Sequence, residues 1–432
     1  MSLQAWLAVA VFASAYVLIA TEWVHRLYAA LGGAAAMVLI GAATSESAFF
    51  SEESGIDWNV VFLLLGMMII VGVLRQTGVF QFLAIWAAKR ARGRPYRVLV
   101  LLLVITAVAS ALLDNVTTVL LIAPVTLLIC ERLGLPPVPF LIAEAMASNV
   151  GGTATLIGDP PNIIIASRSG LSFNDFVLNL APLVVILMIV FVLLSRVMFR
   201  SAFRYDPERV QRVMALEERE AITDPKLLVR VLVVLAFVLA GFTLHSVIHL
   251  EPSVVALLGA GAAVVVSRLG SEDFLAEVEW ETLVFFMGLF VMVGGLVHTG
   301  VIEELGRLAT DAVGDHYLVA ATGLLFGSAV LSGIVDNIPY VATMAPLVAD
   351  LVEKAPPGEA HALWWALALG ADLGGNATAV GASANVVVTG IAARNGHPIS
   401  FWQFTKYGLV VTAVTVTLCW PYLWLRYFVL GG

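Results

Sequence analysis

Two segments of this chain are closely similar although they lie 222 positions apart. Residues 58–90 read WNVVFLLLGMMIIVGVLRQTGVFQFLAIWAAKR, and residues 280–312 read WETLVFFMGLFVMVGGLVHTGVIEELGRLATDA. The agreement continues at the same or the next register, where Asp114 aligns with Asp336, Gly152 with Gly375 and Asn162 with Asn385. Duplicated apolar halves with polar and glycine-rich interruptions at matching positions are typical of a secondary transporter.

Composition indicates that lipid surrounds most of the chain. Of its 432 residues 60% are apolar and 12% are charged, whereas a soluble protein carries about 25% charged residues. Cys130 and Cys419 lie in apolar runs, so we interpret them as core residues without a disulfide or metal role. The first apolar run, from Leu3 to Ala20, lacks a basic leader and is predicted to remain as a helix. We therefore predict a multi-pass protein of the cell (inner) membrane.

The apolar pattern predicts an all-α protein with five spans in each half. Those of the first half lie near residues 3–23, 28–44, 58–76, 137–168 and 174–200. Those of the second half lie near residues 228–247, 251–268, 280–298, 362–393 and 404–427. Each is long enough for a hydrocarbon core of about 30 Å. Residues 80–92 are amphipathic and end with basic residues, so we expect them to lie along the interface.

Four of the apolar segments are interrupted by polar residues. Residues 97–131 and 317–352 each carry a polar centre, which predicts a re-entrant helical hairpin in each half. Residues 137–168 and 362–393 each contain a glycine-rich break, which predicts a discontinuous helix. Lipid does not tolerate unpaired backbone groups, but a cavity lined by protein does. The interruptions are therefore expected to face one shared cavity.

Basic residues predict the orientation of the two halves. They gather in residues 89–97 and 196–230, and such segments remain in the cytoplasm. Five crossings per half then give the halves opposite orientations. We predict a first inverted repeat in residues 1–200, a cytoplasmic linker in residues 201–227 and a second inverted repeat in residues 228–432.

The polar interruptions supply the groups of a solute site. They read DNVTT at residues 114–118, SNVGGTATLIGDPPN at 148–162, DNIP at 336–339 and DLGGNATAVGASAN at 372–385. Broken helix ends expose backbone N–H groups that attract anions or oxygen-rich solutes, and carbonyl groups that attract cations. Glycines such as Gly152 and Gly375 let the backbone approach the solute. The chain has no catalytic triad, phosphate loop, metal cluster or nucleotide signature, so we expect neither an enzyme nor a cofactor or nucleic-acid partner.

Carboxylates within or near these segments are candidates for ion or proton coupling. There are five: Asp114, Glu144, Asp159, Asp336 and Asp372. A carboxylate in the membrane costs about 3 kcal/mol or more unless it is paired or protonated. Three of them have a structural alternative, because Asp114, Asp159 and Asp336 each stand where a helix cap is expected.

Two of these carboxylates have no acidic equivalent in the other half. Asn149 stands in the place equivalent to Asp372, and Leu367 in the place equivalent to Glu144. Such asymmetry is expected where duplicated halves have specialised. Asp372 and Glu144 are therefore our preferred coupling groups.

Four motifs carry a resemblance to a known superfamily. They are DNVTTVLLIAP, GGTATLIGDPPN, VDNIPYVATMAP and GGNATAVGASANVVV, and they are similar to the arsenite/antimonite permease, NhaD and P protein branch of the ion transporter superfamily. The resemblance covers nearly the whole chain. It implies scaffold and transport subdomains, a homodimer and an elevator mechanism. Carried over by position, it implies a solute site formed by Asn115, Thr117, Thr153, Thr155, Asn162, Asn337, Asn376, Thr378 and Asn385.

The hairpin tips separate the functions that the resemblance allows. Sodium/dicarboxylate symporters of this superfamily carry Ser-Asn-Thr there, whereas this chain has Asp114-Asn115-Val116 and Asp336-Asn337-Ile338. This departure favours a proton-linked carrier, and our leading hypothesis is an efflux permease for arsenite or antimonite. A sodium/proton antiporter is the alternative, and an anion or carboxylate carrier is the third hypothesis. The expected partners are membrane lipid, a small inorganic solute with protons (or sodium), a second copy of the chain and a soluble ATPase docked on the cytoplasmic loops.

Overall fold

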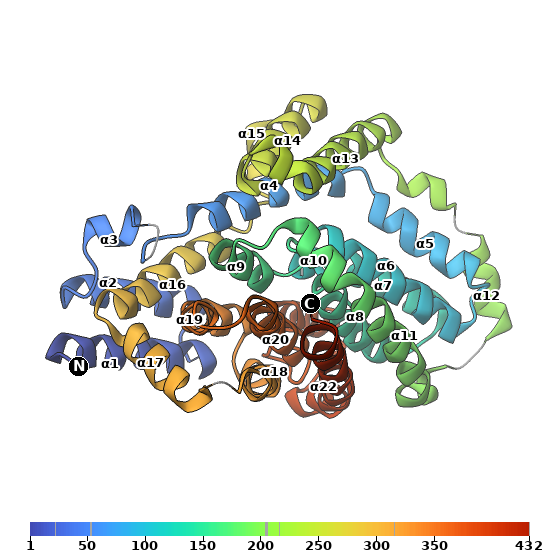
Figure 1. Ribbon diagram of the computed structural model, residues 1–432. Helices are drawn as coiled ribbons and strands as arrows, with labels where there is room; N and C mark the ends of the chain where they lie inside the picture. The colour runs from blue at the N-terminus through green and yellow to red at the C-terminus, as the bar shows by residue number, and fades with distance from the viewer. Residues whose placement is uncertain (22, 52–53, 204–205, 216, 315, 432) are drawn as a thin grey trace.

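The computed structural model describes residues 1–21, 23–51, 54–203, 206–215, 217–314 and 316–431. Within these ranges the chain forms helices and no strand, which confirms the predicted all-α class (Figure 1). Nine helices in the described ranges are long and apolar enough to cross a membrane. Three shorter apolar helices accompany them.

The helices of the first half follow the predicted spans, hairpin and broken helix. They are α1 (Leu3–Thr21), α2 (Arg26–Leu39), α3 (Ser45–Phe49), α4 (Trp58–Arg75), α5 (Val79–Arg90), α6 (Pro95–Leu112), α7 (Asn115–Leu133), α8 (Pro137–Gly152), α9 (Pro160–Ser169), α10 (Phe173–Asn179) and α11 (Ala181–Met198). The hairpin is α6 and α7, and the broken helix is α8 and α9.

The second half repeats this order. Its helices are α13 (Pro225–Ile248), α14 (Pro252–Ser267), α15 (Ser271–Leu275), α16 (Trp280–His298), α17 (Val301–Val313), α18 (Tyr317–Ile334), α19 (Asn337–Val352), α20 (Pro357–Gly374), α21 (Ser383–Arg394) and α22 (Phe401–Leu423), which continues as a π-helix over Trp424–Val429. The hairpin is α18 and α19, and the broken helix is α20 and α21.

The second span of the first half is shorter than the sequence suggested. It was expected over residues 28–44, but α2 ends at Leu39. Gly41 has φ of +73°, a left-handed conformation that ends the helix. Thr44 then caps the short helix α3 by accepting a hydrogen bond from the Ser47 N–H.

One long helix of each half packs against helices of the other half. Helix α4 of the first half packs on α13 and α14 of the second, and α16 of the second half packs on α1 and α2 of the first. Figure 1 shows the blue α4 among the yellow-green α13 and α14, and the gold α16 beside the blue α1 and α2. We call these the α4 group (α4, α13, α14) and the α16 group (α1, α2, α16). In Figure 1 the hairpins and broken helices lie below the α4 group, and most of them lie to the right of the α16 group.

Small residues allow the close packing within both groups. A Cβ atom added to Gly66 of α4 would lie 2.7 Å from the backbone of Ala256 in α14. The equivalent atom on Gly288 of α16 would lie 3.1 Å from the backbone of Ala30 in α2. Small residues at helix contacts are how membrane helices approach closely enough to gain dispersion energy.

The linker between the halves crosses the ends of the first-half helices. Its described part contains η1 (Arg200–Ala202), α12 (Pro207–Met214) and η2 (Glu218–Ala221), whereas residues 204–205 and 216 lie outside the described residues. Thr223 N–H donates to the Thr77 carbonyl at 3.0 Å, directly after α4. Lys89 of α5 forms an ion pair with Glu218, and its hydrogen bond holds the pKa of Glu218 below the ordinary value. The linker is therefore fastened to the ends of α4 and α5.

Candidate functional site

The two hairpin tips are built alike. Asp114 accepts a hydrogen bond from the Thr117 N–H at 2.8 Å and caps α7. Asp336 accepts one from the Ile338 N–H at 3.0 Å and caps α19. The capping role considered for both residues is therefore present in the structure. It leaves the second oxygen of each carboxylate free for another partner.

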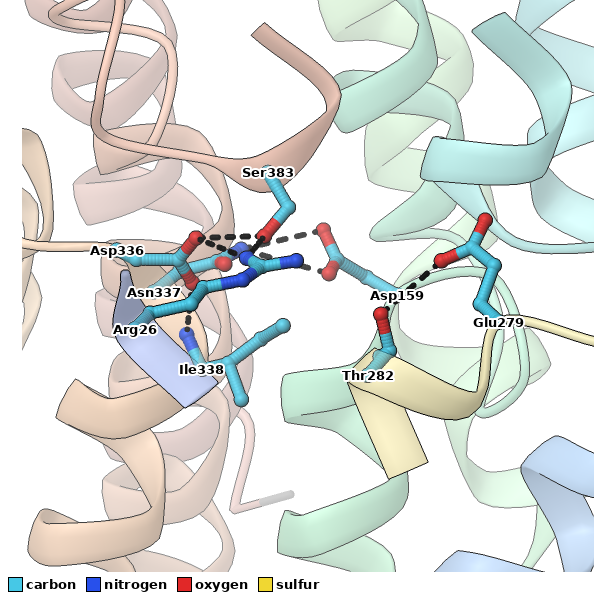
Figure 2. A network of polar contacts seen from close by, with 8 residues as sticks. All are labelled: Arg26, Asp159, Glu279, Thr282, Asp336, Asn337, Ile338 and Ser383. Carbon is cyan, nitrogen blue, oxygen red and sulfur yellow. Dashed lines mark hydrogen bonds and ion pairs between the residues drawn. The ribbon is translucent and has the colours of Figure 1, made fainter. Parts of the chain in front are cut away.

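Asp159 precedes α9, but its side chain makes no capping bond. Its carboxylate instead accepts a hydrogen bond from Asn115 Nδ2 at 2.9 Å. Asn337 Nδ2 approaches both oxygens of the same carboxylate at 3.4 Å (Figure 2). Asn115 and Asn337 are equivalent residues of the two hairpins, so both tips converge on Asp159. All three side chains are buried.

Asn149 connects the two broken helices across the duplication. Its Nδ2 donates to Asn376 Oδ1 and to Asn385 Oδ1, both at 3.0 Å. Its Oδ1 accepts from Asn115 Nδ2 at 3.2 Å. A continuous amide network therefore joins the first hairpin, the first broken helix and the second broken helix.

Two equivalent asparagines brace the breaks from within. Asn162 Nδ2 donates to the Thr155 carbonyl at 3.1 Å. Asn385 Nδ2 donates to the Thr378 carbonyl at 2.9 Å and to the Gly375 carbonyl at 2.8 Å. These bonds satisfy backbone groups that the interrupted helices leave without an intrahelical partner.

The threonines of the breaks donate hydrogen bonds from their hydroxyl groups to backbone carbonyl groups. Thr155 Oγ1 donates to the Ala111 carbonyl at 2.5 Å, and Thr378 Oγ1 donates to the Gly333 carbonyl at 2.7 Å. Each break is thus held against its own hairpin. Thr153 Oγ1 donates to the Asn149 carbonyl at 2.9 Å, within its own helix end.

Gly152 and Gly375 lie where the two sides of each broken segment touch. A Cβ atom on Gly152 would lie 2.5 Å from the Gly158 carbonyl oxygen, and one on Gly375 would lie 3.1 Å from the Gly381 carbonyl oxygen. A side chain at either position would therefore push the two sides of the break apart, whether or not a solute is bound.

Asp372 is fully buried in α20 close to the centre of the network. Its carboxylate faces the side chains of Asn162 and Thr153 in the first broken helix. These two neighbours lie beside the carboxylate, but neither of its oxygens accepts a well-formed hydrogen bond from the described residues, and the same holds for Asn162 Oδ1 and Asn115 Oδ1. One donor, Asn376 Nδ2, is also without a partner. The unsatisfied groups of this centre are mainly acceptors.

The centre is acidic. Asp114, Asp336 and Asp372 are near enough to Asp159 to repel its charge. Of these carboxylates, Asp336 alone forms an ion pair with a cation among the described residues. Removing several charges from water costs several kcal/mol for each unless they are paired. The arrangement therefore favours a bound proton or cation.

Glu144, the other preferred coupling residue, lies apart from this centre. It is buried in α8, where it accepts a hydrogen bond from Thr126 of α7. Its Oε2 has no partner among the described residues. The structure thus brings the polar residues of all four interruptions together but leaves Glu144 to one side.

Arg26, at the start of α2, was not singled out from the sequence. Its Nη1 donates to Ser383 Oγ at 2.6 Å and lies 3.7 Å from Asp336 Oδ2 (Figure 2). Ser383 Oγ in turn donates to Asp336 Oδ2 at 2.6 Å. The sequence could have indicated Arg26 only as a single basic residue at the start of an apolar run. The predicted span over residues 28–44 placed it in a loop instead.

A helical bundle in which paired hairpins and broken helices meet around buried amides and carboxylates is the architecture of a membrane transporter. The CitMHS (citrate transporter) family model matches residues 16–370, and this chain belongs to that family.

Curated relatives extend the match over the whole chain. An uncharacterized transporter of Mycobacterium tuberculosis is 59% identical over 424 residues, covering 98% of this chain and 99% of the relative. The P protein of Homo sapiens is 34% identical over 507 aligned positions, covering 99% of this chain and 60% of the P protein. The resemblance to the P protein branch is thereby confirmed.

A solved structure shares the fold. The YdaH transporter of Alcanivorax borkumensis superposes with a TM-score of 0.64 over 99% of this chain and 98% of that chain, at 16% identity. The protein is therefore a multi-pass membrane transporter, and its bacterial relatives indicate the inner membrane.

Proposed function

We propose that this chain is a proton-coupled secondary transporter that exports arsenite or antimonite. The observation that carries the proposal is the set of acceptor atoms around Asp372 that accept no well-formed hydrogen bond from the described residues, although Asn162 and Thr153 face the carboxylate. Arsenite at neutral pH is an uncharged solute with three hydroxyl groups. It would supply donors to both Asp372 oxygens and to Asn162 Oδ1 without adding negative charge to an acidic centre.

Proton coupling follows from the same groups. A buried carboxylate such as Asp372 is stable when it holds a proton or when donors surround it. Solute hydroxyl groups and a proton would therefore compete for Asp372, and this competition is what exchange requires. Asp159, held by Asn115 and Asn337, would keep the hairpin tips in place while the exchange occurs.

A sodium/proton antiporter is the second candidate, because carboxylate and amide oxygens also suit a small cation. An anion or carboxylate carrier is the third. A multiply charged carboxylate would enter a centre that already contains Asp159 and Asp372, and Arg26 beside this centre is already paired with Asp336. This makes citrate, which names the family, a weaker candidate for this chain.

The proposed working unit follows the repeated architecture. Inverted repeats in residues 1–200 and 228–432 would be joined by a cytoplasmic linker in residues 201–227. The α4 and α16 groups would serve as scaffold, and the hairpins and broken helices would move between them as in an elevator. A homodimer, and docking of a soluble ATPase on the cytoplasmic loops, belong to the same proposal.

Purified protein in proteoliposomes tests the solute directly. Arsenite, antimonite, sodium and citrate would each be applied while a dye reports the internal pH. Proton movement with arsenite or antimonite alone supports the proposal. A response to sodium alone replaces it with the antiporter, and a response to citrate alone replaces it with a carboxylate carrier.

A further inference from the structure

Two cavities lie at equivalent places in the two halves. The larger, about 400 Å³, is bordered by the end of α1, the start of α2, the start of α16 and the start of α21. The smaller, about 330 Å³, is bordered by the start of α4, by α9 and by the start of α14. Phe285 and Val386 line the larger cavity where the equivalent residues Leu63 and Ile163 line the smaller.

The two cavities differ in how deep they reach. Asp336 of the second hairpin tip and Ser383 line the larger cavity. The lining of the smaller cavity includes no residue of the first hairpin tip. Val386 is 38% exposed, whereas Ile163 is 3% exposed. The larger cavity therefore reaches the second hairpin tip, whereas the smaller cavity ends before the first hairpin tip.

The larger cavity lies at the same end of the helices as the linker. The linker is bonded to residues at the end of α4, where Thr223 Oγ1 donates to the Gln76 carbonyl at 2.6 Å. At the same end, Arg75 is paired with Glu277 at 2.8 Å, just before α16 begins. The first turn of α16 lines the larger cavity. Because basic segments remain in the cytoplasm, this is the predicted cytoplasmic side.

Arg26 lines this cavity and connects the α16 group with the second hairpin and the second broken helix. It belongs to α2 of the α16 group, whereas Ser383 and Asp336 belong to the second broken helix and the second hairpin. Its guanidinium also lies 5.4 Å from the centre of the Phe285 ring. Ala30 of α2 and Ala256 of α14 are equivalent, because each contacts the equivalent glycine of α16 or α4. The same alignment places Pro252 of α14 opposite Arg26 of α2, so the second half has no arginine at this position.

We propose that the larger cavity is the cytoplasmic vestibule of the transporter and that Arg26 binds the oxygen atoms of the solute that enters it. This inference rests on the proposed transport function. It adds the path by which the solute enters and the residue that the solute contacts first. A guanidinium has five N–H donors in a rigid fork, so it can exchange Ser383 and Asp336 for solute oxygens. That exchange would release the second hairpin tip from α2 and allow the solute to pass toward Asp159.

Thiol labelling tests the vestibule, and it does not depend on which solute is carried. Val386→Cys and its equivalent Ile163→Cys would be made with Cys130 and Cys419, both buried, replaced by alanine. A membrane-impermeant maleimide would be applied to everted and to right-side-out vesicles. We expect rapid labelling of Val386→Cys in everted vesicles and little labelling of Ile163→Cys from either side. Labelling of Val386→Cys from the outer side alone, or equal labelling of both positions, would overturn the vestibule.

Protection by arsenite tests Arg26. We expect arsenite to slow the labelling of Val386→Cys, and Arg26→Ala to require about tenfold more arsenite, as loss of a charged hydrogen bond predicts. Arg26→Lys should retain part of the protection, and unchanged sidedness without arsenite shows that each variant is folded. Equal protection in Arg26→Ala would overturn the role of Arg26. If Val386→Cys with Arg26 intact labels from the expected side but is not protected by arsenite, that result would overturn arsenite as the solute and leave the vestibule in place.

Discussion

Asn115 of the first hairpin donates a hydrogen bond of 2.9 Å to Asp159 of the first broken helix. The equivalent Asn337 approaches the same carboxylate at 3.4 Å. One side chain thus serves both halves of a duplicated chain. No equivalent acceptor exists in the second half, where Ala382 precedes α21. The site is therefore asymmetric although its supports are paired.

Loss of Asn115 should be more harmful than loss of Asn337, because the first bond to Asp159 is shorter. We expect Asn115→Ala to lower the transport rate about tenfold or more, since truncation leaves Asp159 with only the longer contact from Asn337 and removes the donor to Asn149 Oδ1. Asn337→Ala should have a smaller effect. Initial rates in vesicles, corrected for the amount of protein, measure the difference, and equal rates would contradict it.

Asp372→Asn should abolish proton-coupled transport and leave expression intact. The amide preserves the volume of the side chain but cannot exchange a proton. Asp114→Asn should have the same effect if its carboxylate also takes part in coupling.

Glu144→Gln is the matched control for Asp372→Asn, because Glu144 is also buried but contacts Thr126 outside the central network. The pH profile of whatever solute uptake remains should change in Asp372→Asn. If that profile is unchanged in Asp372→Asn but altered in Glu144→Gln, the coupling group is Glu144 instead.

Crowding at the α4–α14 contact should destabilise the fold. Gly66→Ala would bring a methyl group within 2.7 Å of the Ala256 backbone, and overpacking of this kind costs about 1–3 kcal/mol. Gly261→Ala, on the partner helix α14, meets no atom within 4 Å and should be neutral or stabilising. Thermal denaturation in detergent compares them, and equal melting temperatures would contradict the packing.

Acid should weaken the attachment of the linker to α5. Because Lys89 holds the pKa of Glu218 below its ordinary value, the pair stabilises the attachment above the ordinary pKa of a glutamate. That contribution is lost as the pH falls below the ordinary pKa of a glutamate and through the lowered pKa of Glu218. Proteolytic cleavage of the linker by an acid-tolerant protease should therefore accelerate there. Glu218→Gln should remove this pH dependence, and an identical acceleration in that variant would show that another group is responsible.

Internal duplication allowed much of the fold to be predicted. An Asp-Asn pair within an apolar run indicated each hairpin tip, and the structure has a helix end at Leu112 and another at Ile334. The glycine-rich runs likewise indicated the breaks after Gly152 and Gly374. These features are local, because capping and backbone freedom depend on neighbouring residues.

Features that depend on distant packing could not be predicted. Asp159 stands at a cap position in the sequence, and only the meeting of two hairpins turns it into a shared acceptor. Arg26 and Ser383 are 357 residues apart, so their hydrogen bond has no local signal. The placement of α4 and α16 in the opposite half's helix group is likewise a property of the assembled chain.

Arsenite-driven proton flux tests the central claim most directly. Proteoliposomes containing the parent protein or Asp372→Asn would be loaded with a pH-sensitive dye and given an inward arsenite gradient. We predict that arsenite uptake by the parent protein moves protons in the opposite direction, and that Asp372→Asn gives no proton movement. Arsenite uptake at the same rate with no proton movement in the parent protein would contradict the proposal.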